Sequence, residues 1–269
     1  MSAATVLLVE EPAPHVTRLI LNRPEQLNTI TAELGEALHG ALDTVAKDRT
    51  CRVVILTGAG RGFCAGLDLH GYGAAPGNDG SDESRDRLTN QQHMSTLILA
   101  LRELPQPVIA AVNGPAAGFG LALALGCDIR YASHDAVFRA AFLNIGVSNC
   151  DMGTSWLLPR LIGASRSHEL MLTGRRVSAS EAVEIGLVAD LTSPEALAER
   201  AMAGAQQIAA QSPWGVRLTK QGMWSALEIP SERTAIEYED RQQIMATFGR
   251  AVPEAIGAFL EKRPPQFAD

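Results

Sequence analysis

The sequence predicts an α/β fold with a largely parallel β-sheet, and two observations carry this prediction. First, short apolar runs typical of strands alternate with segments of helical spacing over the first half of the chain. Second, the apolar runs within residues 53–69 and 107–128 each stop at a glycine, loop, and restart as an apolar stretch with helical character. In such sheets, ligands bind beyond the carboxyl ends of the strands.

The expected elements of the first half are five strands and one clear amphipathic helix. The strands are expected at residues 16–21, 53–57, 108–112, 127–132 and 136–139. Residues 53–57 and 108–112 are continuously apolar, as in strands covered on both faces. Residues 31–48 form the expected helix, whose apolar face consists of Leu34, Leu38, Leu42 and Val45.

After Gly146 the chain is predicted to be mainly helical. Helices are expected at residues 152–161, 166–172, 178–185, 194–210, 213–226, 232–248 and 253–262. Ser178 and Glu181 form a capping-box pattern, and Gly186 fits the matching stop. The apolar content of this last third exceeds what a thin helical tail needs, which favours self-association.

Residues 71–87 are dense in glycine and charge and have few apolar anchors. They predict a surface loop that leads into a helix ending near Glu103. Two interpretations stay open, a lid over a site and an ordinary solvent loop.

Composition excludes several classes of protein. The chain has 269 residues and a formal charge of -7, which argues against general nucleic-acid binding because phosphate contacts need surplus lysine and arginine. The four cysteines have no metal-like spacing, so they are expected to be reduced thiols, buried or partly buried, and a metal site is not expected.

A cytoplasmic protein without a membrane span is expected. The N-terminus lacks the basic region and long apolar core of a signal peptide. The uncharged stretch between Glu103 and Asp128 is interrupted by several prolines and glycines, so it is expected to form buried core elements.

The two glycine turns predict acyl chemistry. Glycine permits unusual dihedral angles and close approach of a ligand, and the start of the following helix leaves amide groups without partners. Two such turns that converge on one oxygen atom form an oxyanion hole.

Rival motifs fit less well. Gly58, Gly60 and Gly62 resemble a dinucleotide loop, but the third glycine comes one residue too early. Cys64 could be a nucleophile, yet a small buried thiol fits better because the sequence implies no histidine partner.

Five segments resemble the crotonase, or enoyl-CoA hydratase/isomerase, superfamily. They are LNRPEQLN, GRGFCAGLDL, AAVNGPAAGFG, LTGRRVSASEAVEIGLV and FLEKR, and they occur in the family's order and spacing over nearly the whole chain. The resemblance implies a spiral of ββα units over residues 1–195 and a helical trimerisation region over residues 196–269. It also implies trimers or dimers of trimers and a coenzyme A thioester as substrate, without another tightly bound cofactor.

The resemblance also implies a site. The two oxyanion donors correspond to the backbone amides of Leu67 and Phe119, just after Gly66 and Gly118. The residues that resemble the family's coenzyme A contacts are Arg23, Leu27, Cys64, Ala65, Leu67, Asp68, Leu69, Gly118, Phe259 and Lys262. For Asp68 a turn or helix-cap role is an equal alternative, and for Lys262 the alternative is a solvated helix end.

The acid–base groups depart from the family pattern. Ala122 and Phe142 occupy the positions of the two glutamates that hydratases use, and neither side chain can move a proton. Asp151 is the candidate replacement, with an ordinary helix N-cap as the alternative. Glu237 and Glu239 are weaker candidates.

The sequence therefore predicts an enzyme that processes acyl-CoA or enoyl-CoA through a thioester enolate. Same-fold isomerases, hydrolases or decarboxylases without hydratase activity remain alternatives, as does a largely non-catalytic protein that binds CoA thioesters.

Overall fold

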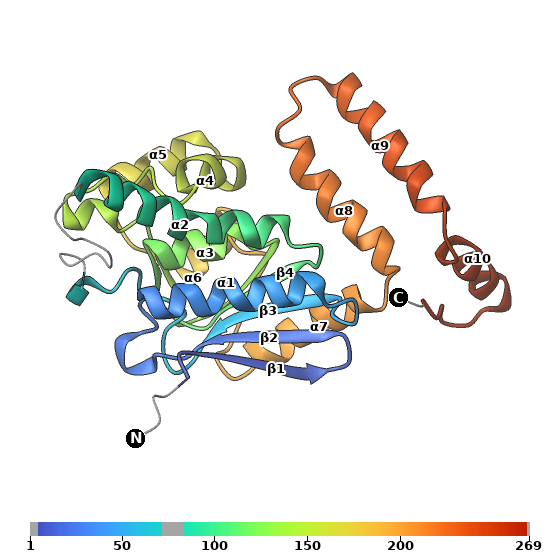
Figure 1. The fold of residues 1–269 in the computed structure, drawn as a ribbon, viewed down its shortest axis with the longest axis horizontal. Coiled ribbons are helices and arrows are strands. Elements are labelled where there is room, and N and C mark those ends of the chain that lie inside the picture. Colours follow the sequence, from blue (N-terminus) through green and yellow to red (C-terminus); the bar gives the residue numbers. More distant parts are fainter. Residues whose placement is uncertain (1–4, 72–82, 268–269) are drawn as a thin grey trace.

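The main sheet contains six strands. They are β1 (Leu7–Ala13), β2 (Val16–Leu21), β3 (Val53–Gly58), β4 (Val108–Val112), β6 (Ile129–Ser133) and β9 (Asp190–Thr192), in the order β1-β2-β3-β4-β6-β9. Only β1 and β2 pair antiparallel; the other neighbours are parallel. This computed structural model describes residues 5–71 and 83–267 and confirms the predicted α/β fold (Figure 1).

A second, smaller sheet lies beside the main one. It consists of β5 (Ala116–Ala117), β7 (Val137–Arg139) and β8 (Val177–Ser178), in the order β5-β7-β8. The strand expected at residues 136–139 therefore belongs to this sheet. Strands β1 and β9 were not predicted, because these sheet edges bury too few side chains to give an apolar pattern.

Helices cover both faces of the main sheet, and β3 shows how. Val54 and Leu56 join the core under α1 (Ala32–Lys47), α2 (Glu83–Glu103) and α3 (Phe119–Gly126). Val53 and Ile55 point to the other face, where they share a core with residues of α7 (Leu197–Ala209). The continuous apolar run of this strand thus reflects burial on both faces, as predicted.

Three further helices and three short 3-10 helices complete the core. The helices are α4 (Thr154–Ile162), α5 (Ala164–Thr173) and α6 (Ala179–Glu184), and the 3-10 helices are η1 (Pro24–Gln26), η2 (Leu69–Gly71) and η3 (Phe142–Ile145). In the described parts of the chain, no helix is long and apolar enough to cross a membrane.

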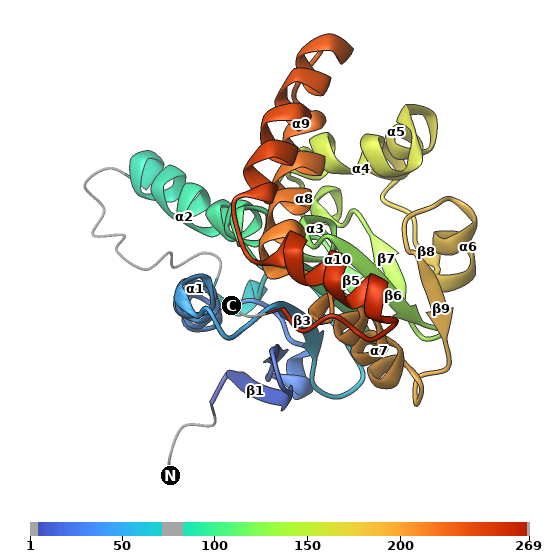
Figure 2. The same ribbon diagram turned by 90° about the vertical axis from the view of Figure 1, so that its right-hand side faces the viewer.

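The last three helices, α8 (Pro213–Ala226), α9 (Glu232–Thr247) and α10 (Ala251–Glu261), extend away from the sheets (Figures 1 and 2). A buried ion pair ties α8 to the core: Lys220 Nζ lies 2.8 Å from Asp128 Oδ2, and Trp224 Nε1 donates to Asp128 Oδ1 at 2.6 Å. Burial lowers the pKa of Lys220. By contrast α9 buries no residue and α10 buries only Ala258.

The domain boundary predicted between residues 195 and 196 assigned α7 to the C-terminal helical region. In the structure Leu197, Ala201 and Ala205 of α7 pack against the main sheet, so this helix is part of the core. The segment that stands off the core begins after it.

Several local predictions need correction. The helix expected at residues 152–161 begins at Thr154, because Met152 and Gly153 have left-handed φ angles of 49° and 74°. Only half of the capping box forms: the Ser178 hydroxyl accepts from the Glu181 amide, but the Glu181 carboxylate pairs with Arg175.

The cysteines also differ in part from expectation. Cys51, Cys64 and Cys127 are buried free thiols, whereas Cys150 is exposed. Most of the loop expected at residues 71–87 cannot be compared, because residues 72–82 lie outside the described residues.

Candidate active site

The two glycine turns meet at the second sheet. The Cys64 amide donates to the Pro115 carbonyl at 3.0 Å, and the Ala117 amide donates to the Cys64 carbonyl at 3.0 Å. Gly66 and Gly118 adopt φ angles of 111° and 52°, which L-residues rarely adopt. Segments about fifty residues apart in sequence are therefore joined by their backbones.

The turns pack so closely that side chains are excluded. A Cβ atom on Gly120 would lie 1.9 Å from the Cys64 carbonyl oxygen, and one on Gly114 would lie 2.1 Å from the Arg61 oxygen. A Cβ built on Gly66 would lie 3.9 Å from the amide nitrogen of Phe119. The first turn thus lies directly against the start of α3.

Among the described residues, this arrangement leaves the backbone amides of Leu67 and Phe119 without hydrogen-bond acceptors. A parallel β-bridge joins Leu67 to Ile30. In it the Ile30 amide donates to the Gly66 carbonyl at 2.8 Å, and the Asp68 amide donates to the Ile30 carbonyl at 2.9 Å. The Leu67 amide, which lies between these two bonds, takes no part in the bridge. Phe119 is the first residue of α3, where amides have no partner inside the helix. In residues 5–71 and 83–267 neither amide has a hydrogen-bond acceptor.

Two asparagines, the buried Asn28 and the half-buried Asn113, hold the first turn in place. Asn28 Nδ2 donates to the carbonyls of Ala59 and Gly62 at 2.9 and 2.8 Å, and its Oδ1 accepts from the Arg23 amide. Asn113 Nδ2 donates to the carbonyls of Gly60 and Gly62. We did not predict these roles, although Asn113, which lies between a strand and a glycine, is typical of a turn.

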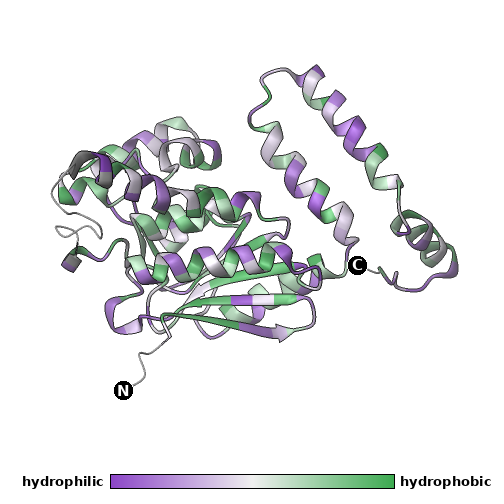
Figure 3. Cartoon of the chain, in the orientation of Figure 1, coloured by the Kyte–Doolittle hydropathy of each residue, from purple (hydrophilic) through white to green (hydrophobic). Residues whose placement is uncertain are grey.

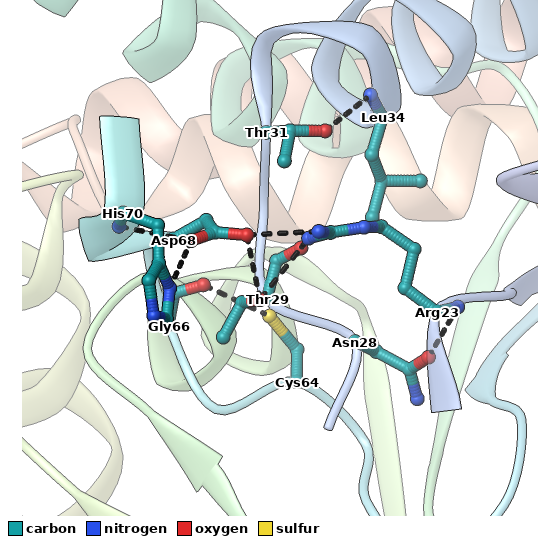
Figure 4. A network of polar contacts seen from close by, with 9 residues as sticks. All are labelled: Arg23, Asn28, Thr29, Thr31, Leu34, Cys64, Gly66, Asp68 and His70. Atoms are coloured by element: carbon teal, nitrogen blue, oxygen red, sulfur yellow. Dashed lines mark hydrogen bonds and ion pairs between the residues drawn. The ribbon is translucent and has the colours of Figure 1, made fainter. Parts of the chain in front are cut away.

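Arg23 and Asp68 form an ion pair beside the first turn (Figure 4). Arg23 Nη2 lies 2.8 Å from Asp68 Oδ2, and the His70 amide donates to Asp68 Oδ1 at 3.1 Å. The Arg23 guanidinium, aided by the His70 amide, lowers the pKa of Asp68 to about 2. Of the two interpretations of Asp68, its turn role is thus present in the structure.

The other residues of the first turn differ in exposure. Leu27 lies next to the turn, and its carbonyl accepts from the Ala65 amide at 2.9 Å. Leu69 is 53% exposed. Cys64 is fully buried, and burial raises the pKa of its thiol to about 12, which disfavours the thiolate that a nucleophile needs.

Ala122 and Phe142, which we predicted to stand where hydratases carry their glutamates, have apolar side chains that lie in the core. Ala122 is fully buried in α3, and Phe142 is 7% exposed. The Phe142 ring carbon Cε1 would lie 3.6 Å from a Cβ on Gly118, so its ring borders the second turn. An aromatic ring therefore lies beside the Phe119 amide.

Asp151 is half-buried and is not a helix cap. The N-cap of α4 is Gly153, so the alternative role for Asp151 is wrong. Its Oδ1 accepts from Gln91 Nε2 of α2 and from the Met152 amide at 2.7 Å. Burial is the largest effect on the carboxyl and raises its pKa. No hydrogen bond of the described residues joins Asp151 to Leu67 or Phe119.

Phe259 and Lys262 are not brought to the turns within one chain. Both lie at the end of α10, at the opposite end of the molecule from η2 (Figure 1). Phe259 is 82% exposed, and Lys262 is also exposed.

The fold and these turns define an α/β protein of the crotonase type. The sequence pattern of the enoyl-CoA hydratase/isomerase family matches residues 13–269. The chain belongs to this family, whose members are enzymes, and the predicted resemblance is confirmed.

Individual relatives span at least 94% of the chain. A probable enoyl-CoA hydratase of Mycobacterium tuberculosis is 44% identical, covering 100% of this chain and 94% of its own. The 1,2-epoxyphenylacetyl-CoA isomerase of Escherichia coli is 40% identical, covering 94% of each chain. The crystal structure of a probable enoyl-CoA hydratase/isomerase from Mycobacterium abscessus matches with a TM-score of 0.90 at 40% identity, covering 97% of this chain and 98% of the other.

Proposed function

We propose that this enzyme isomerises the double bond of an enoyl-CoA and is a poor hydratase. The observation that carries the proposal is the pair of unpartnered amides, Leu67 and Phe119, on two adjoining turns. Preorganised donors of this kind stabilise a thioester enolate, and removing one typically costs about 3 kcal/mol. The apolar Ala122 and Phe142 leave no pair of glutamates to hold a water molecule.

In this mechanism Asp151 moves the proton. Its carboxylate takes a proton from C2 of a 3-enoyl-CoA, the electrons move into a dienolate whose oxygen is held by the two amides, and the carboxyl returns the proton to C4. The product is the conjugated 2-enoyl-CoA. A carboxyl group with a raised pKa suits this exchange because it is a stronger base than an ordinary carboxylate and can still return the proton.

The thioester's coenzyme A part would lie along the first turn. We assign its contacts to Arg23, Leu27 and residues 64–69, together with Gly118. Phe259 and Lys262 would close over it from a neighbouring subunit, because both lie far from the turns of their own chain. A cytoplasmic location is part of the proposal and rests on the free thiols.

Self-association as a trimer or a dimer of trimers fits the last two helices, whose apolar residues are green in Figure 3 and include several with exposed side chains. They include Ile244, Phe248, Ile256, Phe259 and Leu260, with exposures between 56 and 82%. Light scattering should give a mass that is a multiple of three chains. The double substitution Phe248→Ser/Leu260→Ser should yield smaller species, and an unchanged mass would contradict this assignment.

Two thioesters separate isomerase from hydratase. With 3-hexenoyl-CoA the conjugated enoyl absorbance should rise, and with crotonyl-CoA it should hardly fall. Rapid loss of the crotonyl-CoA absorbance would overturn the proposal in favour of hydration. Tight binding of both thioesters without turnover would identify a non-catalytic CoA-thioester-binding protein instead.

A further inference from the structure

A cavity of about 790 Å³ lies between α2, α4 and the link from α8 to α9. Its volume is within the range of small-molecule sites. Much of the lining is apolar and includes Ile98, Leu99, Leu157 and Ile229. An apolar ligand of moderate size is therefore the natural occupant.

Two arginines give one part of this cavity a positive charge. Arg102 of α2 and Arg160 of α4 both stack on the ring of Trp156, with guanidinium carbons 4.6 and 3.8 Å from the ring centre. Arg102 also lies 4.5 Å from the ring of Trp224. Stacking on rings orients the guanidinium groups and leaves their edges for hydrogen bonds.

The positive charge is not fully compensated. Arg102 Nη2 lies 3.3 Å from Oε1 of Glu228, which also lines the cavity and is 63% exposed, so this glutamate offsets at most one of the two positive charges. Arg160 donates to the backbone carbonyl of Trp156, and no carboxylate of the described residues lies within ion-pair distance of it. The Nε atom of Arg102 is buried and has no partner in the described parts of the chain. A buried donor without a partner is costly, so the wall of this cavity carries a polar group that the described residues leave unsatisfied.

The cavity begins next to the candidate base. Met152 and Gly153 line it, and they directly follow Asp151 in the chain. Ser95 and Ile98 line it from α2, the helix whose Gln91 binds the Asp151 carboxylate. The apolar space whose wall carries the two arginines is thus adjacent to the segment and the helix that hold the Asp151 carboxylate.

We propose that this cavity receives the acyl chain and that Arg102 and Arg160 select chains whose far end carries a carboxylate. The inference rests on the proposed function, because it takes a CoA thioester as the ligand. Apolar walls would hold the methylene groups, and the two guanidinium groups would bind the terminal carboxylate. The substrate class is then a CoA thioester of a dicarboxylic acid.

Binding of saturated thioesters tests this independently of turnover. Calorimetry should compare adipoyl-, suberoyl- and sebacoyl-CoA with hexanoyl-, octanoyl- and decanoyl-CoA, which have the same carbon numbers. At least one dicarboxylic thioester should bind about tenfold more tightly than its partner, equal to about 1.4 kcal/mol. Equal affinity in all three pairs would overturn the inference alone, whereas no binding of any thioester would overturn the proposed function as well.

Matched variants assign the preference to the cavity. Arg160→Gln should reduce it to about twofold or less, and Arg160→Lys should retain part of it because the charge remains. Arg217→Gln is the control, since Arg217 also stacks on a tryptophan, Trp214, but does not line the cavity. If both Arg160→Gln and Arg102→Gln kept the tighter binding of dicarboxylic thioesters, the assignment of this preference to the cavity would be contradicted.

The carboxylate could also come from a free fatty acid. Octanoate should bind much more weakly to enzyme saturated with hexanoyl-CoA than to the free enzyme, because the acyl chain would occupy the cavity. Independent binding of octanoate to the saturated enzyme would show a separate fatty-acid site and overturn the assignment to the acyl chain.

Discussion

The two glycine turns and the segment that carries Asp151 are built in opposite ways. The turns pack backbone against backbone and are fixed by Asn28 and Asn113. The segment from residue 143 to 151 is mostly exposed and is fixed mainly by Asn149, which binds the Leu143 amide and the Met171 carbonyl. In the proposed mechanism, polarisation of the carbonyl therefore depends on the backbone, whereas proton transfer depends on a single replaceable side chain.

Removing the carboxylate of Asp151 should have the largest effect. Asp151→Asn should lower kcat for 3-hexenoyl-CoA about 10³-fold, within the usual range for loss of a general base. Steady-state kinetics measures this, with Asp43→Asn as a control at an exposed carboxylate of α1. Full turnover by Asp151→Asn would remove Asp151 from the mechanism.

The same residue predicts a pH dependence. Burial raises the pKa of Asp151 above its ordinary value of 3.8, so activity should fall on the acidic side at a pH above 3.8, where the base becomes protonated. Burial also penalises the charged form, so ionisation of Asp151 reduces stability as pH rises through its raised pKa. Asp151→Asn should therefore be at least as stable as wild type at pH 7 in urea unfolding.

A change in the backbone of the second turn should have the next largest effect. Gly118→Ala places a Cβ at a φ of 52° and should move the Phe119 amide, lowering kcat about 10²-fold. Gly163→Ala is the matched control, since it has a φ of 82° and open space for a Cβ. Both variants should lose stability by about 1 to 3 kcal/mol. Equal kinetics for the two variants would argue against an oxyanion role.

Close packing of the turns predicts a loss of stability. A Cβ on Gly120 would overlap the Cys64 carbonyl, so Gly120→Ala should lower the free energy of unfolding by about 3 kcal/mol. Gly40→Ala is the control: this helical glycine of α1 has nothing within 4 Å, and alanine should stabilise it by up to about 1 kcal/mol. Similar urea midpoints for Gly120→Ala and wild type would show that the turns can separate without a loss of stability.

The smallest effect is expected at the Arg23–Asp68 pair. The pKa of Asp68 is lowered to about 2 in the folded protein. The stability that the ion pair contributes is therefore present above pH 3.8 and is lost as pH falls from 3.8 towards 2. Asp68→Asn should cost about 1 kcal/mol at pH 7 and reduce the acid sensitivity of unfolding. An equal loss of stability on acidification in both proteins would contradict the role of the pair.

The sequence determined most of the core by local pattern. The helix expected at residues 31–48 forms as Ala32–Lys47 with Thr31 as its N-cap, and β4 spans the residues predicted for it. Burial on two faces makes a strand continuously apolar, and burial on one face makes a helix periodic, so these elements are visible in the chain itself. The glycines and family motifs likewise indicated Leu67 and Phe119.

Tertiary structure decided what depends on contacts between distant segments. Only packing shows that α7 belongs to the core, that Asn28 and Asn113 clamp one turn, and that Asp68 pairs with Arg23. The alternative role of Asp151 as a helix cap is wrong because two left-handed residues delay the start of α4. Side-chain hydrogen bonds and long-range approach leave no periodic pattern in sequence, so the fold and the two glycine turns could be predicted while their supports could not.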